Sequence, residues 1–102
     1  QALLVAGTTD FDTDAEALQA ILAEWSSAQP YLDKVGLLRA GGPGALNGTY
    51  LLNASTVHGN THVDVVTGSG TGAARDLVFA SLSGKHKDKI SNVSPADVFV
   101  NI

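Results

Sequence analysis

The stretch from Val63 to Ala80 constrains the fold of this chain more than any other part of the sequence. It consists of a β-branched run, a turn with glycine at every second position from Gly68 to Gly72, and a second apolar run that begins at Leu77. This pattern is typical of two strands joined by a tight connection. It also suits a loop that cradles phosphate or a turn that binds calcium, and the rest of the sequence is needed to choose among the three.

The size and composition of the chain limit what it can be. With 102 residues it is long enough for one domain and too short for two, so we predict that residues 1–102 form a single domain. The formal net charge of −4 argues against binding to nucleic acid, which requires a basic surface. No apolar run approaches the roughly 20 residues that span a bilayer, and the absence of cysteine excludes disulfides and thiolate metal sites. Because the chain begins at Gln1 and lacks methionine, we expect a processed product or a segment of a longer protein.

The first part of the chain predicts a strand and two helices. A short apolar strand is expected over residues 1–6. Thr13 and Glu16 then match a capping box, in which Thr13 is the N-cap of the first helix. An apolar stripe at helical spacing follows, formed by Leu18, Ile21, Leu22 and Trp25.

Pro30 ends the first helix and suits the first turn of a second one, predicted over residues 31–39. Two sets of inward-facing side chains are open for this helix, either Leu32, Val35 and Leu38 or Tyr31, Val35 and Leu38. The glycines from Gly41 to Gly44 then break the chain into a loop.

The second part of the chain predicts strands, at Thr49 to Leu52, Ser55 to His58, Thr61 to Thr67, Leu77 to Leu82, and Asp97 to Ile102. Gly59-Asn60 has the form of a two-residue hairpin turn, and the basic run from Lys85 to Lys89 is expected to be a solvated loop. Because helices come early and strands late, we predict the α+β class, with an N-terminal strand, a helical hairpin, and a mainly antiparallel sheet closed by a C-terminal strand. We recognise no internal repeat.

Three kinds of chemical site are conceivable for these residues. Gly68, Gly70 and Ala73 fit a dinucleotide-binding fingerprint, but the acidic residue about 20 positions on, Asp88, lies among lysines, so a strand connection is favoured. A serine triad around Ser69 lacks the nucleophile elbow. His58, His62 and Asp64 form a plausible ligand set for zinc or iron, which would make the chain a metal-dependent enzyme. None of these sites is favoured by the residue pattern, so we predict that the chain is not an enzyme.

Four segments, taken in order, resemble a known family: AGTTDFDTDAEALQAILAEWSSAQPYLDKVGLLR, LNGTYLLNASTV, VVTGSGTGAARDLVFA and DKISNVSPADVFVNI. Together they are similar to the C-terminal region of large bacterial secreted proteins that carry repeats-in-toxin, haemolysin-type calcium-binding repeats. The resemblance covers nearly the whole chain, and the first segment is its most specific part.

The resemblance implies a β-roll-like sheet with a helical insert, a Gly-Gly-x-Gly-x-Asp-like turn and a closing strand. It implies calcium as the cofactor, with Asp64 and Asp76 as the remaining ligands, and a place outside a bacterial cell or at its surface. In the family's turn an aspartate stands two residues after the last glycine, whereas Asp76 stands four residues after Gly72.

The function that we expect is that of a non-enzymatic structural module that associates with itself through strand edges into a filament, layer or matrix. Terminal strands commonly lie at sheet edges, where unpaired N–H and C=O groups accept another strand. The residues expected at these edges are Leu3, Leu4, Val5, Val98, Val100 and Ile102. The alternative is a monomeric, calcium-responsive module that caps a larger repeats-in-toxin protein or carries its type I secretion signal.

Overall fold

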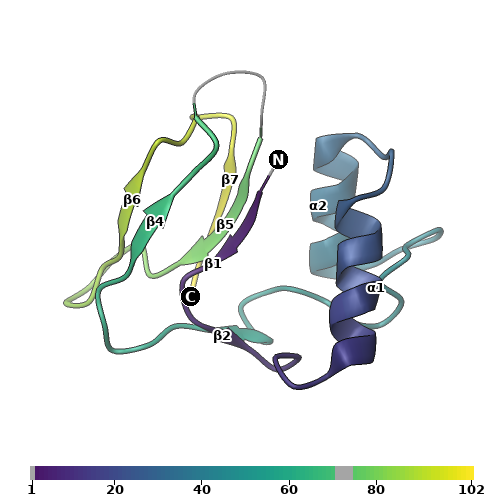
Figure 1. Ribbon diagram of the computed structural model, residues 1–102, viewed down its shortest axis with the longest axis horizontal. Helices are drawn as coiled ribbons and strands as arrows, with labels where there is room; N and C mark the ends of the chain where they lie inside the picture. Colours follow the sequence, from purple (N-terminus) through teal and green to yellow (C-terminus); the bar gives the residue numbers. More distant parts are fainter. Residues whose placement is uncertain (1, 71–74) are drawn as a thin grey trace. The chain divides into compact units, whose positions relative to one another are not determined.

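The computed structural model describes residues 2–70 and 75–102. Its contacts divide the chain into two compact units, unit 1 with Gln1–Thr8 and Val57–Ile102, and unit 2 with Thr9–Thr56. Unit 2 contains the two helices, and unit 1 contains most of the strands (Figure 1). The expectation that residues 1–102 form a single domain stays a prediction.

The first helix, α1, spans Ala15–Trp25 and begins one residue later than the capping box indicates. Its N-cap is Asp14, which has extended backbone angles and accepts a hydrogen bond from the backbone N–H of Ala17 at 3.1 Å. The prediction of Thr13 as N-cap is therefore wrong. Asp14 places a carboxylate at the positive end of the helix dipole, so it satisfies the free N–H groups of the first turn better than a hydroxyl would.

The buried face of α1 also differs from the predicted apolar stripe. Ile21 and Trp25 are buried as expected, but Leu22 is 59% exposed. The face instead includes Glu24, which is fully buried because its carboxylate accepts hydrogen bonds from the hydroxyl of Ser27 and from the backbone N–H of Leu46. A hydrophobic pattern cannot identify a buried carboxylate, because its burial depends on hydrogen-bond donors that lie elsewhere in the chain.

The second helix, α2, spans Tyr31–Ala40, in agreement with the prediction. Val35 and Leu38 are buried, whereas Leu32 is 69% exposed, so the inward-facing set is the one that contains Tyr31. The ring of Tyr31 packs edge-on against that of Trp25, with centroids 6.1 Å apart. This aromatic contact joins the end of α1 to the start of α2. Within the described part of the chain, neither helix has the length and apolarity needed to cross a membrane.

The segment that follows α2 in unit 2 is a loop, and the predicted strand over Thr49 to Leu52 is wrong. Its backbone is held by Asn47, whose side-chain amide donates to the carbonyl groups of Leu37 and Tyr50 at 3.1 and 2.8 Å. Leu52 donates to the carbonyl of Leu38 at 2.7 Å. A side-chain donor and a carbonyl acceptor of α2 thus replace the neighbouring strand that the segment would otherwise need.

The described residues form seven strands, β1 (Leu3–Val5), β2 (Thr8–Thr9), β3 (Val57–His58), β4 (Val65–Thr67), β5 (Leu77–Ala80), β6 (Lys89–Ser91) and β7 (Val98–Asn101). They form a three-stranded sheet in the order β1-β5-β7 and two two-stranded sheets, β4-β6 and β2-β3. The α+β class is confirmed. The predicted terminal strands and the strand after the glycine-rich turn correspond to β1, β7 and β5.

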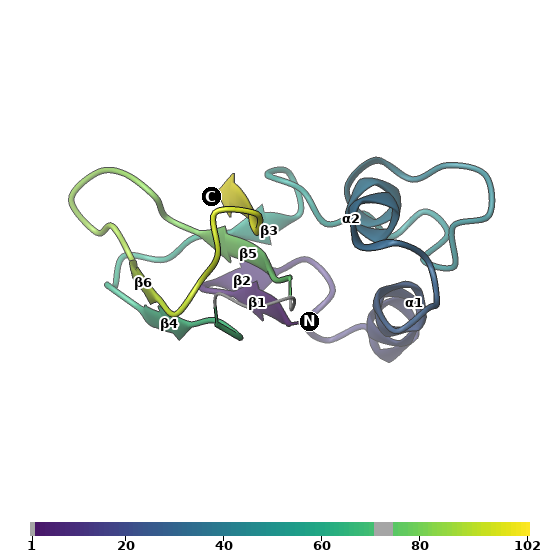
Figure 2. The ribbon, with the colours of Figure 1, turned by 90° about the horizontal axis from the view of Figure 1, so that it is seen from above.

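The longer strands pair in parallel, which corrects the prediction of a mainly antiparallel sheet. The hairpin predicted at Gly59-Asn60 is wrong as well, because β3 pairs with β2 and β4 pairs with β6. The physical reason is that the chain crosses to the other sheet after each strand, from β4 to β5, back to β6, and over to β7. From β4 to β7, strands that follow one another in sequence therefore do not pair (Figure 2).

This winding divides unit 1 into stacked coils. We call β1 the first coil, β4 with β5 the second, and β6 with β7 the third. The core between the sheets contains the buried residues Ala6, Val66, Val78 and Ala80, with Leu4, Leu82, Ile90 and Phe99 packed against them. Parallel register places Leu4, Val78 and Phe99 in one row and Val66 beside Ile90, so equivalent apolar residues stack from coil to coil.

Candidate functional site: the aspartate ladder and edges of unit 1

An aspartate stands immediately before each strand of the second and third coils. Asp64 precedes β4, Asp76 precedes β5, Asp88 precedes β6 and Asp97 precedes β7. We call these four residues the aspartate ladder. They are all the acidic residues of unit 1, and three of them, Asp76, Asp88 and Asp97, are buried.

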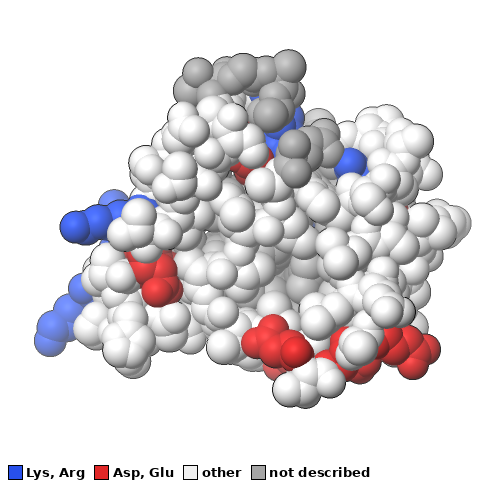
Figure 3. Space-filling view, in the orientation of Figure 1, with Lys and Arg blue, Asp and Glu red and all other residues white. Residues whose placement is uncertain are grey.

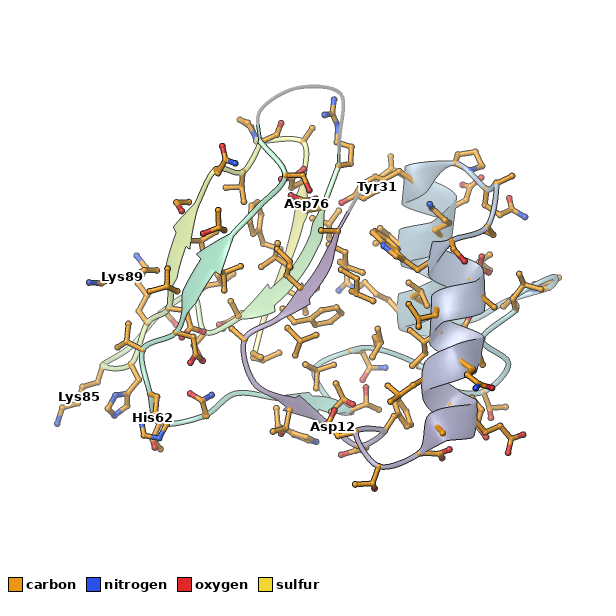
Figure 4. The ribbon with its side chains drawn as sticks, in the orientation of Figure 1. Asp12, Tyr31, His62, Asp76, Lys85 and Lys89 are labelled. Atoms are coloured by element: carbon orange, nitrogen blue, oxygen red, sulfur yellow. The ribbon has the colours of Figure 1, made fainter. Side chains whose placement is uncertain are left out.

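The carboxylate of Asp76 connects the second coil to the first. Its Oδ1 accepts the backbone N–H of Ala2, the residue before β1, at 2.9 Å. Its Oδ2 accepts the backbone N–H of Ser69 in the turn after β4, at 2.7 Å, and Oδ1 accepts the Ser69 hydroxyl at the same distance. Figure 4 shows Asp76 at the end of the strands where this turn lies. One side chain thus fixes both a neighbouring coil and its own turn.

Asp97 and Asp88 repeat this arrangement. Asp97 accepts the backbone N–H of Asp76 at 3.0 Å and that of Ser94 at 2.9 Å. Asp88 accepts the backbone N–H of Asp64 and that of Ser81, both at 2.8 Å. In each case one oxygen reaches the residue before the neighbouring strand, and the other reaches the loop that leads into the aspartate's own strand. Hydrogen bonds to a carboxylate are stronger than those to neutral acceptors, so the ladder is a principal source of order in these short coils.

The pKa of Asp76 reflects its place in the ladder. Burial by itself raises the pKa of this carboxyl, because a charge is costly away from water. The hydrogen bonds from Ser69 and Ala2 stabilise the charged form and outweigh that effect, so the pKa lies below the ordinary value for aspartate. Asp76 is therefore held as a carboxylate at neutral pH.

Asp64 occupies the same position in its coil but has a different environment. It is half-buried, and its Oδ2 accepts from the side-chain amide of Asn60 at 3.0 Å. Its own backbone N–H belongs to the ladder, because it donates to Asp88. Among the residues that the structure describes, no backbone N–H of a neighbouring coil reaches the Asp64 carboxylate.

The predicted calcium ligands Asp64 and Asp76 are not brought together. Asp76 lies at one end of the strands, and His62, two residues before Asp64, lies near the other (Figure 4). Both oxygens of Asp76 already accept N–H or O–H groups. The structure therefore provides Asp76 with a structural role, and calcium binding stays a prediction.

The predicted histidine ligands are exposed. His58 lies in β3, and the backbone N–H of His62 donates to the side chain of Asn60 at 2.9 Å. Within residues 2–70 and 75–102, no three side chains of His, Asp or Glu are grouped to hold a metal ion. Of the dinucleotide fingerprint, Gly68 and Gly70 are described, Gly72 and Ala73 lie outside the described residues, and Asp88 belongs to the ladder.

The outer edge of β7 is formed by backbone groups that point away from β5. Val98 and Ile102 donate to the carbonyl groups of Asp76 and Ala80, at 3.2 and 3.0 Å, so the backbone of these two residues faces β5. Because backbone direction alternates along a strand, the N–H and C=O groups of Phe99 and Asn101 face away from β5. Between the described residues, no backbone hydrogen bond from Phe99 or Asn101 is made on that side.

The outer edge of β1 is arranged in the same way. Ala2 accepts the N–H of Leu77 at 2.9 Å, and Ala6 donates to Phe79 at 2.8 Å, so these residues face β5. The backbone groups of Leu3 and Val5 then face outward. Of the predicted assembly residues, Leu3, Leu4 and Val5 lie in one edge strand, Val98 and Val100 lie in the other, and Ile102 follows it.

Charge is distributed unevenly between the two units. Unit 1 contains equal numbers of acidic and basic residues, and the excess of acidic residues lies in unit 2. In unit 1 the aspartates are largely turned inward, while basic side chains project from one side (Figure 3). Lys85, in the loop that leads to β6, and Lys89, in β6, are found there (Figure 4).

Asp88 and Asp97 are the site residues that the sequence prediction missed. The signal is present in the sequence, because Asp-x followed by an apolar residue occurs at Asp64, Asp76, Asp88 and Asp97, with spacings of 12, 12 and 9 residues. The prediction that the chain has no internal repeat did not take this recurrence before strands into account. No family model matches the chain, and no curated protein or solved structure shows significant similarity to it.

Proposed function

We propose that the chain is a non-enzymatic structural module that assembles head to tail through the outer edges of β1 and β7. The observation that carries the proposal is that these two strands form opposite edges of one parallel sheet. A parallel sheet is extended by a strand of the same direction, and β1 of a second copy offers such a strand to β7. Because the two edges are different surfaces, the contact repeats without limit unless it closes into a ring.

The register of the sheet supports this pairing. Leu3, Leu77 and Val98 are Cα partners in one row across the sheet. If Leu3 of a second copy lies beside Val98, its N–H meets the carbonyl of Asp97, and its carbonyl meets the N–H of Phe99. These are the groups that face outward. Leu4 of the second copy then stacks on Phe99, which continues the apolar row between the sheets.

Sedimentation velocity tests the proposal with two variants of one edge residue. Proline at Val5 removes an outward N–H and blocks the edge without breaking the pairing of β1 with β5. Wild type is expected to form oligomers that grow with concentration, Val5→Pro to remain monomeric, and Val5→Thr, which keeps the N–H, to resemble wild type. A wild type that is strictly monomeric at millimolar concentration would contradict the proposal.

The place of assembly suggested by the family resemblance is outside a bacterial cell or at its surface.

A monomeric capping module is the second candidate, and one observation favours it. The N–H groups of Asp88 and Asp97 donate to the carbonyl groups of Ser81 and Ser94, in the loops that lead into β6 and β7, at 2.9 and 3.0 Å. The aspartate ladder is thus closed at the end formed by the third coil. A capping module predicts a monomer at every concentration. If it responds to calcium, isothermal titration calorimetry gives micromolar binding, whereas an absence of heat leaves the capping role without calcium.

A further inference from the structure

The outward side of α2 carries a groove within unit 2, and its lining includes Leu32, Asp33, Gly36, Leu37 and Pro43. Leu32 is 69% exposed, and Asp33 is the one charged residue that lines the groove. Asp33 is itself exposed, and no ion pair joins it to another described residue. Such a groove suits a basic side chain, because the apolar stem packs on the leucines while the charged head meets the carboxylate.

Gly36 lies in the middle of this face, although nothing in the chain requires a glycine there. A Cβ added to Gly36 would meet no atom within 4 Å. Glycine in a helix interior costs about 1 kcal/mol relative to alanine. Its use to a helix is that it lets another backbone approach closely. The open space over Gly36 is therefore the place where a second helix can cross α2 at the shortest distance.

The residues around Gly36 form an ordered pattern. Leu32, Gly36 and Ala40 make one row along α2, because residues four apart are neighbours on a helix surface. Asp33 and Arg39 stand three residues before and three residues after Gly36, so they flank the row on opposite sides. All five residues are exposed, and Arg39, like Asp33, has no ion pair among the described residues. The row thus carries an acid on one flank and a base on the other.

We propose that this face of α2 binds the same face of a second copy, with the two helices crossing at Gly36. The two rows lie against each other in the same direction, as in the commonest class of helix packing, with the axes about 50° apart. A two-fold axis along the rows then brings Arg39 of each copy to Asp33 of the other. The stem of Arg39 enters the groove, and its guanidinium meets the carboxylate there.

The two charges select both the partner and the direction. If one helix is turned end for end, the rows still match, but each Asp33 faces Asp33 and each Arg39 faces Arg39, which is repulsive. With the rows in the same direction, opposite charges meet at both flanks, so the face is complementary to itself. This is the observation that argues for a second copy as the occupant.

The contact lies in unit 2 and does not depend on association through β1 and β7. A contact between two single helices is small, in the class below roughly 1,200 Å² that gives weak encounters. It is therefore expected to form only near millimolar concentration, and Val5→Pro stays monomeric at lower ones.

Sedimentation equilibrium of Val5→Pro tests the contact, because the strand edge of this variant is blocked. Near millimolar concentration Val5→Pro is expected to form dimers. Asp33→Arg and Arg39→Asp, each added to Val5→Pro, place like charges at both flanks and are expected to weaken dimerisation about tenfold or more. An equimolar mixture of these two variants is expected to regain the affinity of Val5→Pro, because opposite charges meet again in the mixed pair. Glu16→Arg makes the same charge change on an exposed residue of α1 and is expected to leave dimerisation unchanged.

Oxidation of single cysteines tests the direction of the helices, since the chain has no cysteine of its own. Leu32 meets Leu32 of the other copy when the rows run in the same direction, and Ala40 when they run in opposite directions. Leu32→Cys in the Val5→Pro chain is expected to give a covalent dimer much faster than Leu22→Cys, which is exposed on α1. Circular dichroism confirms that each variant is folded. A Val5→Pro chain that stays monomeric at millimolar concentration, a mixture that associates no more than its components, or equal cross-linking at Leu32 and Leu22 overturns the proposal.

Discussion

The carboxylate of Asp88 accepts the backbone N–H of Asp64 at 2.8 Å, and this bond joins two residues that precede paired strands in successive coils. Asp97 and Asp76 have the same relationship in the other sheet, at 3.0 Å. Strands of three or four residues offer few ladder hydrogen bonds of their own. The aspartates supply further bonds at the point where each strand begins, which is why so short a set of coils holds together.

Truncation of Asp88 tests this role. Asp88→Ala leaves the partly buried N–H groups of Asp64 and Ser81 without their acceptor. We expect the free energy of unfolding to fall by about 2–4 kcal/mol, because each lost bond involved a charged group and leaves an unsatisfied donor. Urea denaturation followed by circular dichroism measures the change. The matched variant is Asp64→Ala, whose half-exposed carboxylate accepts only from Asn60, and its loss is expected to be below about 1 kcal/mol.

The lowered pKa of Asp76 makes stability depend on pH. Because the pKa in the folded chain lies below the unfolded value of roughly 3.9, the ionised carboxylate stabilises the fold above that value. This contribution is lost as pH falls through the folded pKa. Asp76→Asn is therefore expected to be less stable than wild type at pH 7, with the difference shrinking toward pH 2. Thermal unfolding of both proteins across this range measures the gap, and a gap that stays constant contradicts the prediction.

Substitution of two glycines by alanine is expected to change stability in opposite directions. A Cβ on Gly68 would lie 2.6 Å from a methyl group of Val93 and 2.7 Å from the carbonyl oxygen of Asn92, so Gly68→Ala forces the second and third coils apart. A Cβ on Gly36, in α2, meets nothing within 4 Å. Gly36→Ala is expected to raise the free energy of unfolding by roughly 0.5–1 kcal/mol, and Gly68→Ala to lower it by more than that. Denaturant titration of each variant measures whether its free energy of unfolding rises or falls.

The start of α1 provides a local test of helix capping. Asp14→Ala removes the acceptor of the Ala17 N–H and is expected to cost about 1 kcal/mol. Thr13→Ala, one residue earlier, is expected to change the free energy of unfolding by less than about 0.5 kcal/mol. Chemical denaturation of the two variants compares them, and a larger effect at Thr13 would restore the capping box as the true start of the helix.

The elements of this chain were more predictable than their pairing. The helices were identified from turn residues and capping signals close in sequence, β5 from its apolar run, and β7 from the alternation of its residues between two faces. The direction of pairing depends instead on contacts between residues far apart, such as Leu3 with Leu77. A Gly-Asn dipeptide favours a hairpin turn, which would pair the strands on either side of it. Burial of Val66 in the core with Val78 and Ala80 instead directs its strand to pair with β6, and this burial outweighs the local turn preference.

The candidate site was only partly predictable, for a related reason. The apolar residues of the edge strands could be named from the sequence because terminal strands commonly lie at sheet edges. Asp88 appeared to belong to a solvated basic loop, because Lys87 and Lys89 flank it. It is buried because its carboxylate meets the N–H groups of Asp64 and Ser81, and charge patterns do not reveal such partners. The spacing of the four aspartates was the usable signal.

Disulfide cross-linking tests head-to-tail assembly most directly, because the chain has no cysteine of its own. Leu3 and Val98 are separated by β5 within one copy, roughly 9.5 Å apart and beyond the reach of a disulfide, but lie in adjacent strands across the proposed contact. Oxidation of Leu3→Cys combined with Val98→Cys is expected to give a ladder of covalent oligomers on a non-reducing gel. Leu3→Cys combined with Phe99→Cys, whose side chains point to opposite faces of the sheet, is expected to give none beyond dimers. If both double variants remain without such a ladder, assembly through β1 and β7 is contradicted.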